Sequence, residues 1–178
     1  MRVFHLIKLL FFIFFISVFS ECKNAHVENI LTNENKSIKV FIDIDSIGKP
    51  YYMLYFNDKL VLDTSYLGLK YEDLDLTNNF KLIEIQKPVV ITDSYELFQG
   101  KRKYNEYKAL QYKVVFDNAE SQKLICEFNL STNGFAYRYI IDRNDNWKIL
   151  NEQSTFRFPD STSAWLQPMS VAKVGGKK

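Results

Sequence analysis

From residue 38 onward, apolar and polar side chains alternate with a period of two in many short stretches. In the first of them, isoleucine or valine occupies positions 38, 40, 42 and 44, and Lys39 and Asp43 lie between them. A period of two predicts a β-strand that buries one face. Turn-forming residues separate the stretches, and 63–67 is predicted to be a loop. The other predicted strands cover residues 51–56, 59–62, 68–71, 80–87, 89–91, 104–117, 123–130, 135–141, 152–158 and 164–166.

The same pattern predicts an all-β fold. Residues 95–110 come closest to a helical period of 3.6, but Gly100 and the basic run at 101–103 interrupt it. Short strands with turn signals about every ten residues are typical of an antiparallel β-sandwich. A domain of about 150 residues buries roughly 70% of the surface of its unfolded chain, which is enough for a core between two sheets.

The first twenty residues have the pattern of a signal peptide. Arg2 and Lys8 form a basic start, an apolar run follows at 9–19, and the small residues Val18 and Ser20 precede a cleavage site. This order predicts a secreted, periplasmic protein. A buried core helix and an uncleaved anchor are the alternatives, although the apolar run is about half as long as a membrane-spanning helix.

Residues 21–36 are polar and rich in asparagine, and they predict a flexible leader before a domain that covers residues 37–178. Cys22 raises the alternative of a lipid anchor. Glu21 argues against it, because lipoprotein signals resemble one another in having a small residue before the cysteine. Cys126 lies in an apolar strand pattern and is predicted to be an inert core residue, with a disulfide to Cys22 as the alternative.

The composition is that of a globular protein, with 47% hydrophobic and 25% charged residues. The chain has 23 basic and 21 acidic residues, and two of the basic ones are Arg2 and Lys8. The rest of the chain is therefore neutral, which is not the charge of a protein that binds nucleic acid or an anionic membrane. We expect no nucleic-acid partner and no stable membrane insertion.

Histidine is almost absent, since His5 and His26 are the only two and both precede the predicted domain. This excludes a Ser-His-Asp or Cys-His nucleophile system and any histidine-based zinc site within the domain. Residues 142–153 begin with oxygen-bearing side chains at alternate positions, as the loop of a calcium site does. However, Trp147 and Gln153 stand where such a loop needs Gly and Glu. No catalytic, cofactor-binding or metal-ligating residue is assigned.

Aromatic residues are plentiful, and two tryptophans are candidates for stacking on sugar rings. These are Trp147, after a predicted strand, and Trp165, in the last one. A sandwich core rich in tyrosine explains most of the other aromatic residues, and it is the alternative for these two as well.

The order of short motifs resembles the N-terminal domain of glycoside hydrolase family 97. The resemblance covers about residues 37–170, and it depends on the order of the motifs, none of which is specific alone. The motifs are SIKV at 37–40 with GKPYY at 48–52, LVL at 60–62, LGL at 67–69, GKR at 100–102, YNE at 104–106, GFAYRY at 134–139 and AWLQP at 164–168.

This resemblance implies a secreted α-glucosidase or α-galactosidase of the Bacteroidetes type. In that family the N-terminal domain is a large sandwich related to galactose mutarotase, and it packs on a catalytic (β/α)₈ barrel that carries the two carboxylates beside a calcium ion. A calcium-ligating glutamate of the sandwich would follow the motif at 164–168. The resemblance therefore implies a sandwich that is incomplete at its C-terminal end, with no catalytic residue or calcium ligand within this chain.

The favoured hypothesis is thus a non-catalytic fragment of a family 97 enzyme, truncated before the barrel. Two alternatives belong to other classes of protein. One is a free-standing sandwich that binds carbohydrate through exposed Tyr or Trp side chains. The other is a sandwich whose sheet edge pairs with another protein chain.

Overall fold

The structure, a computed structural model, describes residues 29–141, 148–160 and 162–165, so the predicted signal peptide and the first half of the predicted leader lie outside it. The described residues form twelve strands and no helix, and they therefore contain no helix that could span a membrane. The strands are β1 Ile30–Thr32, β2 Ile38–Ile44, β3 Pro50–Phe56, β4 Lys59–Tyr66, β5 Leu69–Tyr71, β6 Asp75–Leu76, β7 Phe80–Ile85, β8 Val89–Glu96, β9 Tyr104–Asn118, β10 Lys123–Ser131, β11 Phe135–Ile140 and β12 Ile149–Glu152.

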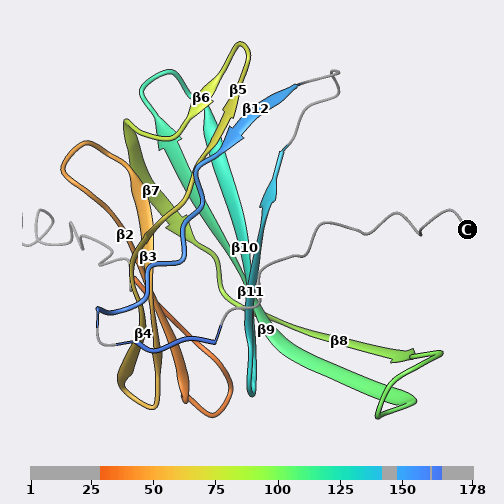
Figure 1. Cartoon of the computed structure of the whole chain (residues 1–178). Coiled ribbons are helices and arrows are strands. Elements are labelled where there is room, and N and C mark those ends of the chain that lie inside the picture. The colour runs from red at the N-terminus through yellow and green to blue at the C-terminus, as the bar shows by residue number, and fades with distance from the viewer. Residues whose placement is uncertain (1–28, 142–147, 161, 166–178) are drawn as a thin grey trace, which may run out of the picture.

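These strands form two main antiparallel sheets and one small sheet. The first sheet has the order β1-β2-β3-β4, and the second has the order β11-β10-β9-β7 with β8 also beside β9. The small sheet, β12-β5-β6, lies at one end of the molecule (Figure 1). The predicted all-β, antiparallel fold is confirmed.

The core lies between the two main sheets, because alternate side chains of each sheet point toward the other. In β9 and β10 the inward positions are almost completely buried, as at Phe116 and Phe128. The hydroxyl of Tyr112 reaches across to the first sheet and donates a hydrogen bond to the carbonyl of Thr32 at 2.8 Å. The fully buried aliphatic side chains include Leu31, Val40, Ile42, Leu67, Val114, Leu124 and Leu130.

The turn between β2 and β3 is fixed by its glycine. Gly48 has a φ of 74°, a conformation that other residues adopt only with strain. Its carbonyl accepts a hydrogen bond from the backbone N–H of Phe80 at 2.9 Å, so the turn lies directly against the start of β7. A Cβ atom at this position would lie 2.8 Å from the backbone nitrogen of Phe80. The turn therefore has room only for glycine.

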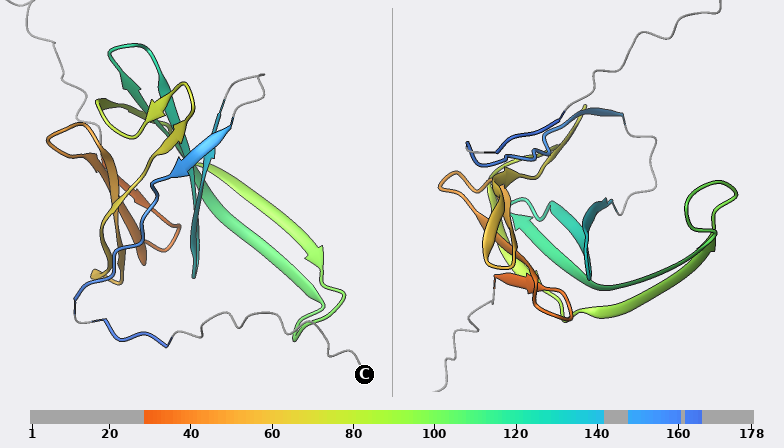
Figure 2. Two further views of the ribbon diagram at one scale, coloured as in Figure 1. Left: turned by 45° about the horizontal axis from the view of Figure 1, so that its top comes forward. Right: turned by 60° about the horizontal axis from the view of Figure 1, so that its bottom comes forward.

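A long hairpin projects from the second sheet, and Figures 1 and 2 show it curving away from the two packed sheets. We call this hairpin, residues 89–108, the arm. It consists of β8 and the first part of β9, and within the arm these strands pair from Thr92↔Lys108 to Glu96↔Tyr104. The β8 half of the arm does not pack against the core, since every residue of β8 is exposed except the partly buried Ile91. The exposed large apolar side chains of the arm are Val89, Val90, Tyr95, Leu97, Phe98 and Tyr104.

The prediction of a leader at 21–36 is wrong for its last part. Residues Ile30–Thr32 form β1, which pairs with β2, and the side chain of Leu31 is completely buried. Asn33 is buried too, because its side chain bonds to the backbone of Ile38 and Ser131. These contacts order the segment despite its polar composition.

Three other predictions near the sheet edges also need correction. β4 runs through the predicted loop as far as Tyr66. The predicted strand at 152–158 is absent, because β12 ends at Glu152 and only an isolated bridge, Asp63↔Arg157, follows. Of the predicted strand at 164–166, the first two residues belong to no strand, and Leu166 lies outside the described residues.

Candidate interaction surface

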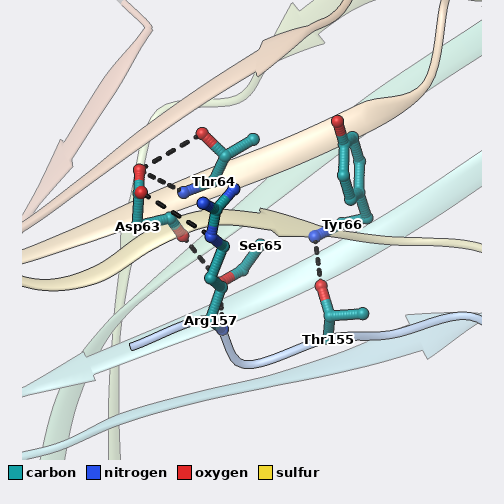
Figure 3. A network of polar contacts seen from close by, with 6 residues as sticks. All are labelled: Asp63, Thr64, Ser65, Tyr66, Thr155 and Arg157. Carbon is teal, nitrogen blue, oxygen red and sulfur yellow. Dashed lines mark hydrogen bonds and ion pairs between the residues drawn. The ribbon is translucent and has the colours of Figure 1, made fainter. Parts of the chain in front are cut away.

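A short segment after β12 closes the exposed edge of the first sheet. This segment, residues 153–157, is called the strap, and Figure 3 shows its contacts with β4. The backbone N–H of Thr155 donates to the carbonyl of Tyr66 at 3.0 Å, and the N–H of Tyr66 donates to the hydroxyl of Thr155 at 2.7 Å. The strap thus satisfies polar groups at a strand edge that would otherwise face solvent.

Arg157 fixes the end of the strap. Its carbonyl accepts from the N–H of Asp63 at 2.8 Å, and its own N–H donates to the hydroxyl of Ser65 at 3.0 Å. Its guanidinium lies 3.8 Å from the carboxylate of Asp63, an ion pair that adds little because both groups are partly exposed. The backbone bonds therefore do most to hold the strap in place.

The strap also connects the first sheet with the second. The carbonyl of Thr155 accepts from the hydroxyl of Tyr52 at 3.1 Å, and the hydroxyls of Ser154 and Tyr139 lie 2.6 Å apart. Tyr139 in turn accepts from the N–H of Gly68 at 3.0 Å. The tyrosine hydroxyls of this region are thus used within the protein.

Beside the strap, aromatic rings line a shallow hollow of about 380 Å³. Tyr137 lines it, and the ring centroid of Tyr137 lies 5.6 Å from that of Tyr52, 5.7 Å from that of Phe128 and 6.0 Å from that of Phe156. Phe156 is more than half exposed, whereas Tyr52 and Phe128 are completely buried. The hollow is therefore the rim of the core.

The buried tyrosines predict a loss of stability at alkaline pH. Burial raises the pKa of Tyr52 and of Tyr139 above the ordinary value of 10.0. Since each folded-state pKa is raised, the stability is fully present below about pH 10 and is lost as the pH rises toward the folded-state pKa. We expect the free energy of unfolding at about pH 11 to be lower than at about pH 9 by about 1 kcal/mol for each tyrosine.

Urea titrations at the two pH values, with tyrosinate absorbance as a second signal, measure this effect. The double variant Tyr52→Phe, Tyr139→Phe is the control and should show a much smaller difference. If the double variant lost as much stability between the two pH values as the parent, Tyr52 and Tyr139 would not be the source of the pH dependence.

The hydroxyl of Thr155 predicts a second, smaller effect. Thr155→Val removes the acceptor for the N–H of Tyr66 while it keeps the shape of the side chain. We expect it to lower the free energy of unfolding by about 1 kcal/mol, whereas Thr155→Ser should keep most of the stability. Chemical denaturation followed by circular dichroism measures the difference, and equal stability of the two variants would be the contrary result.

A second, larger hollow of about 780 Å³ lies where the arm leaves the sheet. The polar side chains around it include Asp93, Glu106 and Lys108 of the arm and Asn133 of the turn after β10. The ammonium of Lys108 lies 2.7 Å from the carboxylate of Glu34, and the pair is about half exposed. The hollow is thus an open, polar corner between the arm and the end of β10.

The described residues do not fit a metal site, since no group of three or more His, Cys, Asp or Glu side chains occurs among them. The calcium ion that the resemblance implies for a whole family 97 enzyme therefore has no cluster of ligands in this part of the chain. Cys126 is a free thiol inside the core, as predicted, and burial raises its pKa, so it is unreactive.

The structure describes one of the two candidate tryptophans. Trp165 is fully exposed and belongs to no strand. Trp147 and the loop at 142–147 lie outside the described residues, so its role stays a prediction. The strap and the arm were not predicted as functional elements.

Comparisons with known proteins agree with this architecture. The profile of the family described as Glycosyl-hydrolase 97 N-terminal matches residues 31–176. No curated protein sequence matches the chain significantly.

Among solved structures, a β-arabinopyranosidase is similar with a TM-score of 0.73 and 27% identity, over 84% of this chain and 24% of that one. A family 97 enzyme from Pseudoalteromonas sp. strain K8, in complex with panose, has a TM-score of 0.63 and 20% identity, over 74% of this chain and 20% of its own. The same enzyme with acarbose has a TM-score of 0.64. This chain thus spans a quarter or less of the length of these structures.

The described residues form an antiparallel sandwich with a projecting arm, and the family match covers most of the chain. The chain belongs to the N-terminal domain family of glycoside hydrolase 97, and the matched region contains no catalytic domain.

Proposed function

We propose that the chain is the N-terminal sandwich of a secreted, periplasmic glycoside hydrolase that acts on α-glucosides or α-galactosides. The similarity to a β-arabinopyranosidase at 27% identity is the observation that carries the proposal. In the L series, a β-arabinopyranoside has the ring configuration of an α-galactoside. This favours an α-galactoside as the substrate.

The sandwich would support and orient the catalytic domain and would not react with the substrate. Glycoside hydrolysis needs two carboxyl groups on opposite sides of the scissile bond. The acidic side chains of the described residues are mostly exposed and scattered, and they form no cluster. The reacting carboxylates would therefore come from the catalytic domain.

The test begins with the DNA that follows the codon for Lys178, where we expect a reading frame that encodes a barrel. The whole polypeptide should hydrolyse p-nitrophenyl α-galactoside faster than the α-glucoside, and residues 21–178 alone should hydrolyse neither. Hydrolysis by residues 21–178 alone would overturn the proposed division of roles, and the absence of a barrel would overturn the proposal as a whole.

Secretion is tested separately by the N-terminal sequence of the exported protein. We expect it to begin at Glu21, after cleavage behind Ser20. A chain that keeps Met1, or that carries lipid on Cys22, would contradict this prediction.

The full exposure of Trp165 favours a second candidate function, the binding of carbohydrate by this domain. Calorimetry with maltooligosaccharides should then show weak binding that Trp165→Ala or Trp147→Ala reduces and that salt does not change. The absence of binding at millimolar sugar would exclude this candidate.

A further inference from the structure

The outer face of the first sheet carries aromatic and apolar side chains. In β2 and β3 the buried side chains alternate with partly exposed ones, and the pairing places Phe41 directly opposite Met53 on the outer face. Tyr51 and Tyr66 are also paired on this face, and their ring centroids lie 6.5 Å apart. None of these four side chains belongs to the described core between the sheets. The first sheet therefore presents a second apolar surface on its outside.

The outer face of the second sheet is different, because it carries polar pairs between neighbouring strands. The side-chain amide of Gln111 donates to the side-chain oxygen of Asn129 at 3.1 Å. On the next pair of strands, the guanidinium of Arg138 lies 2.6 Å from the carboxylate of Glu127. Polar outward positions are ordinary for an antiparallel sheet that faces water. The aromatic outer face of the first sheet thus needs an explanation of its own.

A shallow hollow of about 290 Å³ opens on the outer face of the first sheet. Ile30 and Phe41, which are directly opposite one another in β1 and β2, form its apolar side. Lys39 and Asp58 form its polar side, and their ammonium and carboxylate groups lie 2.6 Å apart. Tyr55 of β3, opposite Lys39, also lines the hollow. The hollow therefore combines an aromatic wall with an ion pair.

The size of this hollow favours a small ligand. Pockets for small molecules usually have about 300–1,000 Å³, so the hollow lies at the lower end of this range. A stable contact with another protein covers about 800 Å² of each partner, which is far more than the side chains around this hollow provide. The charges of Lys39 and Asp58 cancel, so the hollow does not favour an ion. A neutral ligand with a single ring fits these properties.

A pyranose ring has both of the surfaces that the hollow matches. The C–H groups on one face of the ring are apolar and can pack on the ring of Phe41. The hydroxyl groups at the edge both donate and accept hydrogen bonds. A hydroxyl beside the ion pair can accept from the ammonium of Lys39 and donate to the carboxylate of Asp58, and bonds to charged groups are the stronger ones.

Among pyranoses, galactose has the more apolar face. Its axial hydroxyl leaves the hydrogens of three neighbouring carbon atoms on the opposite face of the ring, whereas in glucose these hydrogens are divided between the two faces. We propose that the hollow between Phe41 and the Lys39–Asp58 ion pair binds a galactopyranosyl unit of an α-galactoside. The choice of galactose rests on the proposed function. The place of binding is independent of Trp165 and rests on the hollow itself.

Titration of the purified chain with methyl α-galactopyranoside, followed by nuclear magnetic resonance, tests the proposal. We expect a dissociation constant of about 1 mM, which is typical of a weak, specific contact. The backbone amides that change their chemical shifts should be those of the residues that line the hollow. Methyl α-glucopyranoside should bind more weakly, because its face is less apolar.

Two variants and a control assign the binding to this hollow. Phe41→Ala removes the aromatic wall, and Asp58→Asn removes the negative charge at a position whose φ of 63° asparagine tolerates. Each should weaken binding at least about fivefold. Tyr66→Ala is the matched control, because it removes an aromatic side chain from the same face that does not line the hollow. It should leave the affinity unchanged, and circular dichroism verifies that all three variants are folded.

Other outcomes overturn the proposal. These are the absence of shift changes at about 10 mM galactoside, and unchanged affinity in a folded Phe41→Ala or Asp58→Asn variant. Shift changes that Trp165→Ala abolishes would place the binding elsewhere on the domain. A dimer that Phe41→Ala dissociates, identified by sedimentation, would show that a second copy covers the hollow. A whole enzyme that cleaves no α-galactoside would leave this binding measurable, so the two proposals fail separately.

Discussion

Replacing Phe128 by alanine should lower the free energy of unfolding by about 3–5 kcal/mol. The side chain is completely buried in β10, and its ring centroid lies 6.4 Å from Tyr52, 6.1 Å from Phe135 and 5.7 Å from Tyr137. The substitution leaves a cavity between the two sheets, which these rings can fill only in part. Because a domain has about 5–15 kcal/mol of stability in total, the variant should be largely unfolded in mild denaturant.

Guanidinium denaturation followed by circular dichroism measures this loss. Phe98→Ala is a matched control, because it removes the same side chain from the tip of the arm, where it is completely exposed. The control should stay within about 0.5 kcal/mol of the parent. A loss below about 1 kcal/mol for Phe128→Ala would show that the two sheets do not pack as described.

Gly48→Ala should have the next largest effect, a loss of about 2–5 kcal/mol. The backbone of Gly48 is in the left-handed region, where alanine is strained. The new methyl group would also lie 2.8 Å from the nitrogen of Phe80 and 2.9 Å from the Cα of Asn79. Both are backbone atoms, and hydrogen bonds from these two residues to the turn hold them in place.

The thermal midpoint, measured beside Gly134→Ala, checks this prediction. Gly134 also lies in a turn, but a methyl group there would meet only the hydroxyl of Ser131 at 3.2 Å, which can rotate away. The control should therefore lose no more than about 1 kcal/mol. Equal losses in the two variants would mean that the contact between the turn and β7 is unimportant.

The strands with a strong local pattern could be predicted from the sequence. The alternation at 38–44 and the aromatic run at 51–56 correspond to β2 and β3, and the turn at Asn57 and Asp58 joins β3 to β4. Both residues of that turn have positive φ, as Asn and Asp tolerate. In such segments the residues that form the turn and the residues that are buried lie close together in the sequence.

The elements that depend on distant residues could not be predicted. β1 lies in a polar stretch, and it is ordered because Leu31 enters the core and Asn33 bonds to Ser131. In the strap, the alternation does not reflect burial in a sheet, since Phe156 touches Tyr137 while its own side chain stays more than half exposed. An apolar residue at every second position is therefore consistent with a strand and also with a segment that is bound along a sheet edge.

The arm is another element that could not be predicted from the local sequence. Pro88 separates the predicted strands at 80–87 and 89–91, which form β7 and β8 on the same side of β9. Nothing in the local pattern indicates that β8 extends beyond the core, because its apolar run at 89–91 resembles that of a buried strand.

The strap also constrains when the domain can finish folding. The bond from Tyr52 to Thr155 joins residues that are 103 positions apart, and the bond from Tyr66 to Thr155 joins residues 89 apart. During synthesis or export from the N-terminus, the edge of β4 thus stays open until almost the whole domain has emerged. Contacts between residues so far apart in the sequence slow folding. Until they form, the edge of β4 is exposed and prone to aggregation. A chaperone that covers β4 at this stage would therefore raise the yield of folded protein more than one that acts on the completed domain.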